Sequence, residues 1–155
     1  MSFRISALDP RDFEKYFAMS DDELAQHRAV RRVATEKPGA PCRVSLADAD
    51  IGDELLLVNY VHQDSASPYR AAHAIFVRKG VAQARPAIGE VPESLWLRQL
   101  SLRAFDDQAM IVAADLVDGK ALAPALERLL ADPAAAYVHI HFAKFGCYAA
   151  RADRT

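Results

Sequence analysis

The sequence predicts an α+β fold in one globular domain, residues 1–155, and two patterns carry that prediction. Apolar and polar residues alternate at the period of a β-strand in several short segments, among them 3–7, 42–46 and 95–105. One segment instead repeats its leucines at the period of a helix, at Leu122, Leu126, Leu129 and Leu130. These patterns favour a mixed, mostly antiparallel sheet with helices packed on it.

The N-terminal half begins with an expected strand and two helix starts. Asp9-Pro10 is typical of a first helical turn, and Ser20 with Glu23 has the spacing of a capping box for a short helix over 21–26. Further strands are expected over 28–34, over 42–46 after a turn-rich loop, and over 54–62. The unbroken apolar run in 54–62 indicates a strand that is buried on both faces.

The C-terminal half predicts a ten-residue loop over 63–72, then strands over 73–78, 95–105 and 110–117. A helix over 122–131 follows, then strands over 137–143 and 147–151. The order strand, helix, strand from 110 to 143 is typical of a βαβ crossover, which would make its two strands parallel neighbours.

The composition excludes several classes of protein. The net charge is −2 and no block of like charges occurs, which argues against nucleic-acid binding. No apolar run reaches the roughly 18 residues of a membrane span, and 1–10 contains no secretory signal. We therefore expect a cytoplasmic protein with no membrane partner, and no cofactor is required for a chain of this size to fold.

Two cysteines, Cys42 and Cys147, are the first candidates for chemistry. They are too far apart for a metal or redox motif, so buried, unreactive thiols are one interpretation and a nucleophile is the other. A nucleophilic thiolate needs a nearby cation, but Arg43 would point away from Cys42 if both lay on a strand.

A histidine pair, His139-Ile140-His141, forms the second candidate. On a strand both imidazoles would share one face with Tyr137, while the residues between them face the core. The pair could be half of a metal site completed by His62, His73 or a cysteine. A solvent-facing or internally satisfied pair is the alternative, and it leads us to expect no metal.

An arginine–tyrosine set is the third candidate. Tyr69 and Arg70 lie in the long central loop, and Arg43, Arg98 and Arg103 lie on or beside strands. Guanidinium groups suit carboxylates or phosphates. The alternative is internal pairing with Asp48, Asp50, Asp106 or Asp115.

Three segments together resemble the bacterial domain-of-unknown-function family numbered 1203. They are Pro41-Cys42-Arg43-Val44-Ser45-Leu46, Ser67-Pro68-Tyr69-Arg70 and His141-Phe142-Ala143 with Gly146-Cys147-Tyr148. The resemblance implies a small stand-alone bacterial protein and no particular activity.

Three hypotheses of function follow from the sequence. The leading one is a binding module or small enzyme with a pocket for a small anionic ligand, in which Arg43, Tyr69 and Arg70 contact the anion. The same pocket would be lined by Cys42, His141, Cys147 and Tyr148. The second is a thiol- or metal-dependent enzyme that uses Cys42, His141 and Cys147. The third is a structural or protein-interaction domain with no small-molecule site.

Overall fold

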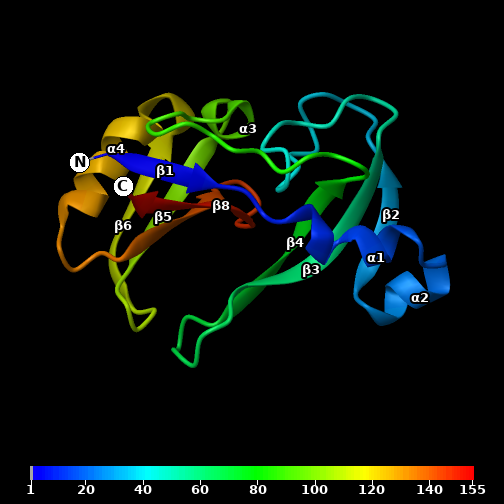
Figure 1. Cartoon of the computed structure of the whole chain (residues 1–155), viewed down its shortest axis with the longest axis horizontal. Coiled ribbons are helices and arrows are strands. Elements are labelled where there is room, and N and C mark those ends of the chain that lie inside the picture. The colour runs from blue at the N-terminus through cyan, green and yellow to red at the C-terminus, as the bar shows by residue number, and fades with distance from the viewer. Residues whose placement is uncertain (1) are drawn as a thin grey trace.

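The computed structural model describes residues 2–155 and contains two antiparallel sheets that lie beside each other (Figure 1). The larger sheet has the strand order β1-β8-β7-β5-β6 and the smaller one the order β2-β3-β4. Helix accounts for 19% and strand for 38%, so the α+β class is confirmed. Among the described residues, no helix is long and apolar enough to cross a membrane.

The larger sheet consists of β1 (Phe3–Ser6), β5 (Gln99–Phe105), β6 (Ile111–Asp118), β7 (Tyr137–Phe142) and β8 (Tyr148–Arg154). The smaller sheet consists of β2 (Ala29–Val33), β3 (Glu54–Gln63) and β4 (Ala71–Arg78). The helices are α1 (Glu14–Phe17), α2 (Asp21–Gln26), α3 (Glu93–Trp96) and α4 (Leu122–Ala131), with single 3-10 turns at Pro10–Asp12 and Gly119–Ala121.

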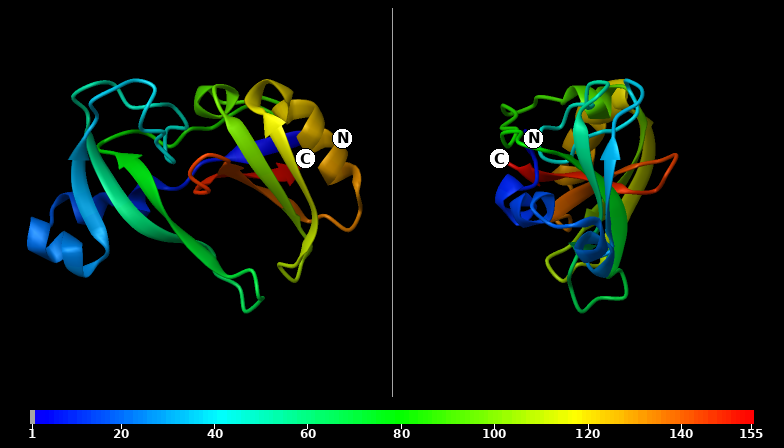
Figure 2. Two further views of the ribbon diagram at one scale, coloured as in Figure 1. Left: turned by 180° about the vertical axis from the view of Figure 1, so that it is seen from behind. Right: turned by 90° about the vertical axis from the view of Figure 1, so that its right-hand side faces the viewer.

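Helix α4 covers one face of the five-stranded sheet, as the left view of Figure 2 shows. Its predicted leucine stripe is confirmed, because all four leucines are at most 5% exposed and pack on the sheet. Val138, Ile140 and Phe142 of β7 enter the same core, as their alternation predicts. The opposite face of β7, with Tyr137, His139 and His141, therefore points toward the three-stranded sheet and away from α4.

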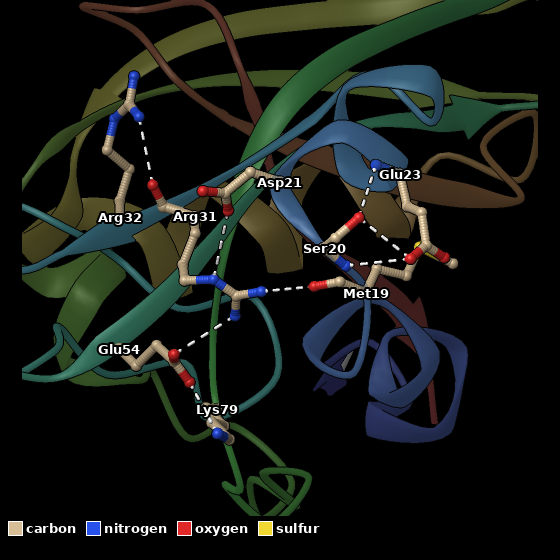
Figure 3. Close-up of polar contacts among 8 residues, drawn as sticks. All are labelled: Met19, Ser20, Asp21, Glu23, Arg31, Arg32, Glu54 and Lys79. Atoms are coloured by element: carbon tan, nitrogen blue, oxygen red, sulfur yellow. Dashed lines mark hydrogen bonds and ion pairs between the residues drawn. The ribbon is translucent and has the colours of Figure 1, made fainter.

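The three-stranded sheet is anchored to α2 by polar contacts (Figure 3). The predicted capping box is present, since the Ser20 hydroxyl accepts from the Glu23 amide and the Glu23 carboxylate accepts from the Ser20 amide. Arg31 on β2 donates to the Met19 carbonyl and pairs with Glu54 on β3 at 3.3 Å. These contacts fix the helix against the outer edge of the sheet, away from the larger one.

The predicted mixed sheet with a βαβ crossover is wrong in its pairing. All strand pairs of both sheets are antiparallel. Strands β6 and β7 are joined through α4 as expected, but β5 lies between them and pairs with both. The short turn after β5 forces β6 into a hairpin with it, and β7 then occupies the only other edge of β5.

Two other segments also differ from the prediction. Residues 42–46 form turns with Leu46 at a φ of +54°, because the loop folds back so that Leu46 donates to the Cys42 carbonyl. The segment 95–105 begins in α3 and enters β5 only at Gln99. The strand over 54–62 is confirmed as β3, but only its first half is buried on both faces, since Asn59 and Val61 are exposed.

Candidate metal centre

Four of the five histidines gather where the two sheets meet. His62 lies near the end of β3 and His73 near the start of β4, while His139 and His141 come from β7. The rings of His62 and His141 form an edge contact with centroids 4.9 Å apart, and those of His73 and His141 lie 5.5 Å apart. Only His27, at the end of α2, lies elsewhere. Residues separated by up to 79 positions thus form one cluster.

Three of these side chains, His62, His73 and His141, have the geometry of a metal site. Each offers one ring nitrogen, and these nitrogens lie within 4.8 Å of one another. The closest pair, Nε2 of His62 and Nδ1 of His73, is 2.7 Å apart. Nitrogens bound to tetrahedral Zn²⁺ lie about 3.3 Å apart, given Zn–N bonds of about 2.0–2.1 Å. The two nitrogens of His62 and His73 share a hydrogen bond in this structure, so an ion would take the place of the shared proton and hold them slightly further apart.

The orientation of His141 is set by Gly146. Nδ1 of His141 lies 3.0 Å from the Gly146 carbonyl oxygen, and since a carbonyl can only accept, Nδ1 carries the proton. Nε2 is then left with a free lone pair. That atom is buried in a residue with 0% exposure and has no hydrogen-bond partner among the described residues. A metal-binding histidine is held in the same way, by donation from its other nitrogen to a carbonyl.

The segment Gly146-Cys147-Tyr148 supports the cluster with each of its residues. The Gly146 carbonyl holds the His141 ring. The Tyr148 ring stacks on the His62 ring with an interplanar angle of 7° and a centroid separation of 5.3 Å. Arg43 donates to the Tyr148 carbonyl at 2.8 Å and to the Cys147 sulfur at 3.0 Å. The segment is thereby bound to both sheets, and it places the His141 and His62 rings at a fixed angle.

The protonation of the cluster suits metal binding. Burial lowers the pKa of His139 and of His141 to about 3, and that of His62 to about 4, with further lowering by neighbouring positive groups. Burial also lowers the pKa of His73, and Arg103 adds to the effect. All four imidazoles are therefore neutral at neutral pH, which is the form that binds metals.

These pKa values predict a loss of stability in mild acid for the chelator-treated protein. A buried histidine that titrates near 3 in the folded state and near 6.5 when unfolded favours unfolding as the pH falls below 6.5. From pH 7 to pH 5 the expected decrease in unfolding free energy is about 2 kcal/mol for each of His139 and His141. Urea unfolding at the two pH values measures it. An unfolding free energy equal at pH 7 and pH 5 would contradict the burial of these rings.

Gly146 is predicted to be required for the site and not only for the fold. It has a φ of +76°, which disfavours a side chain. Gly146→Ala should therefore lower the free energy of unfolding by about 1–2 kcal/mol. It should also tilt the carbonyl group that holds His141. Gly80→Ala is the matched control, because Gly80 has a φ of +72° and open space around it but lies in the turn after β4. Calorimetry should show similar destabilisation in both variants, and only Gly146→Ala should weaken Zn²⁺ binding.

The structure places the predicted cysteine and arginine residues around the cluster, in supporting positions. Cys42 is buried and its sulfur accepts from the Ser45 and Arg78 amides, so the buried-thiol interpretation is confirmed for it. Cys147 is half-buried, and both thiols are free. Because Arg43 lies in a turn and not on a strand, its side chain can reach Cys147, and it forms no ion pair with a carboxylate among residues 2–155.

Arg43 is 2% exposed, and each of its three guanidinium nitrogens donates a hydrogen bond. Besides Cys147 and the Tyr148 carbonyl, it donates to the Pro41 carbonyl at 2.6 Å, and it lies over the Phe142 ring. The expected internal pairing is instead confirmed for Arg98, which binds both carboxylate oxygens of Asp48. Arg43 thus acts as a cross-link between the 41–43 turn and β8.

Tyr69 and Arg70 lie apart from Arg43, at the tip of the β3–β4 hairpin. Arg70 forms an ion pair with Asp64 across the loop, and the Tyr69 ring is 40% exposed and contacts Phe105 edge-on. The structure does not direct these three side chains at one ligand. Anion binding by Arg43, Tyr69 and Arg70 therefore stays a prediction.

The sequence placed His139 and His141 on one face and named His62 and His73, beside the cysteines, as residues that could complete a metal site. The interpretation of His139 and His141 as solvent-facing or satisfied is wrong, because they are 4% and 0% exposed and each has a buried nitrogen without a partner among residues 2–155. In the sequence, His62 and His73 directly flank the predicted loop over 63–72. Two strands joined by such a loop pair as a hairpin, and this was the feature that could have indicated that the two histidines face each other. A surface hollow along α2 and β2 contains none of the four.

Comparison with known proteins adds a family but no activity. The family model described as "Protein of unknown function (DUF1203)" matches residues 39–154, so the chain belongs to that family, as the three segments predicted. Neither the curated proteins nor the solved structures gave a match. The matched range includes His62, His73, His139 and His141 and the supporting segment 146–148.

Proposed function

We propose that this member of the family binds a divalent transition metal through His62, His73 and His141. The observation that carries the proposal is the buried Nε2 of His141, which has no hydrogen-bond partner among residues 2–155, in a group of three histidines whose ligand nitrogens lie within 4.8 Å of one another. A buried polar atom with no partner is costly, at about 1–3 kcal/mol, and a bound ion would remove that cost. The hydrogen bond to Gly146 directs the lone pair of this nitrogen toward the other two rings.

The ligand set favours particular metals. Neutral imidazoles suit Zn²⁺, Cu²⁺, Ni²⁺ and Fe²⁺, whereas Mg²⁺ and Ca²⁺ prefer oxygen ligands. The group consists of histidines alone, so the protein ligands leave the full charge of the ion uncompensated. Three protein ligands also leave a coordination position open, which is typical of sites that bind water or a substrate and not of structural zinc sites.

The proposal keeps the metal of the thiol- or metal-dependent hypothesis but replaces its two cysteines. His141 is retained as a ligand, with His62 and His73 taking the places considered for the cysteines. Cys147 supports the site through its contact with Arg43. An enzymatic activity would use the open position on the metal.

Metal titration of untagged protein tests the proposal. After treatment with a chelator, the protein should bind one equivalent of Zn²⁺ or Co²⁺ in calorimetry. His73→Gln should lower the affinity by about 100-fold or more, because removing even a supporting group of a metal ligand costs 10–100-fold. His27→Gln is the control, since His27 lies outside the cluster. Equal affinity in the wild type and His73→Gln, or no binding to either, would refute the proposal.

A further inference from the structure

Arg103 is a charged group beside the histidine cluster that the metal centre itself does not use. It lies on β5 directly opposite His139 of β7, and its neighbour two residues back, Ser101, lies opposite His141. Side chains at opposed positions of an antiparallel pair share a face of the sheet, with Cβ atoms about 4.5–5.5 Å apart. The guanidinium of Arg103 therefore emerges on the face that holds His139 and His141, opposite α4.

Arg103 is half-buried and lacks the partners that the neighbouring arginines have. Arg98 is paired with Asp48 at 2.7 Å and Arg151 with Asp153 at 2.7 Å. Within residues 2–155, no hydrogen bond or ion pair to the Arg103 side chain is found, and burial alone lowers its pKa. A half-buried guanidinium without a partner is partly desolvated, so it binds an anion favourably.

The charge around the cluster also favours an anion. With a divalent ion on three neutral imidazoles, the centre would carry two positive charges, and Arg103 adds a third. The carboxylate of Asp153, which affects the pKa of His139, is already neutralised by Arg151. The positive charge of Arg103 lowers the pKa of each of His62, His73 and His141. Of the described residues, no carboxylate is among the main influences on the pKa of His62, His73 or His141.

From this arrangement we infer that the open metal position and Arg103 together bind a small oxyanion, a carboxylate or a phosphate. One oxygen would occupy the open position, and a second would accept from the Arg103 guanidinium. The inference rests on the proposed metal centre and names the class of its ligand. It also moves the anion site expected from the sequence from Arg43, Tyr69 and Arg70 to Arg103.

The inference is tested with Co²⁺-substituted protein, whose visible spectrum reports changes at the metal. Titration with acetate and, separately, with inorganic phosphate should change the spectrum with saturation, and the tighter of the two identifies the oxyanion. Arg103→Gln should weaken that binding at least about 10-fold, as expected for one lost charged hydrogen bond. Arg103→Lys keeps the charge but not the fixed planar geometry of the guanidinium, so its anion affinity should lie between those of the wild type and Arg103→Gln.

Two controls separate this inference from the metal proposal. Arg32→Gln removes one positive charge from an exposed position on β2 and should leave anion binding unchanged. Arg103→Gln should bind Co²⁺ at least as tightly as the wild type, because the substitution removes a positive charge beside the three histidines. If Co²⁺ binds but neither anion changes the spectrum, or if Arg103→Gln binds anions as the wild type does, the inference is overturned. If Co²⁺ does not bind at all, the proposed metal centre itself fails.

Discussion

Saturating Zn²⁺ should raise the melting temperature of the chelator-treated protein by roughly 8–16 °C. A ligand that binds only the folded state stabilises it by about 4 kcal/mol at 1,000 times its dissociation constant, and each kcal/mol corresponds to about 2–4 °C for a chain of this size. The effect is large because His62, His73 and His141 come from both sheets, so a bound ion would link them. Differential scanning calorimetry with and without Zn²⁺ measures it.

His141→Gln should abolish that increase, because the open nitrogen of His141 is the best oriented of the three. His139→Gln is the demanding control, since His139 lies on the same face and strand but is not one of the three clustered ligands. It should retain most of the Zn²⁺ response. An equal response in the His141→Gln variant and the wild type would mean that Zn²⁺ stabilises the protein from some other site.

Arg43→Ala should lower the free energy of unfolding by about 3–5 kcal/mol. The substitution leaves the carbonyl oxygens of Pro41 and Tyr148 without their donor, at about 1–3 kcal/mol each, and opens a cavity over Phe142. Part of this loss is offset, because the variant no longer has to bury a charged guanidinium, which is itself unfavourable. Urea unfolding monitored by circular dichroism measures the change.

Arg43→Met separates packing from hydrogen bonding. Methionine fills most of the volume but donates no hydrogen bond, so this variant should recover part of the loss and not all of it. Arg32→Ala, at an exposed position, should change the unfolding free energy by less than about 0.5 kcal/mol. If Arg43→Ala is as stable as the wild type, Arg43 is not the structural cross-link described above, and a ligand-binding role returns.

The parts of the fold that the sequence predicted are those determined by local patterns. The leucine stripe of α4, the capping box at Ser20 and the alternation in β7 each express one period or one cap, and all three are present. Pairing was not predictable in this way. Alternation in a segment such as β6 or β7 indicates which face is buried, but it is silent on which strand occupies the neighbouring edge.

The candidate site depends on that missing information. The face of His139 and His141 followed from period two, but the burial of that face depended on a second sheet packing over it. The cluster forms because the β3–β4 hairpin places His62 and His73 against β7, a contact between residues more than 60 positions apart. The turn at 43–46 could not be told from a strand either, because its apolar and polar residues alternate as in a strand and the backbone reversal at Leu46 leaves no mark in that pattern.

Anomalous diffraction from crystals grown with Co²⁺ or Zn²⁺ tests the central claim most directly. Data collected on both sides of the absorption edge should show one strong peak about 2.0–2.1 Å from a ring nitrogen of each of His62, His73 and His141. The hydrogen bond between the His141 ring and the Gly146 carbonyl should persist. A peak at another place in the molecule would contradict the claim. So would the absence of a peak in crystals in which Nε2 of His62 and Nδ1 of His73 are still 2.7 Å apart.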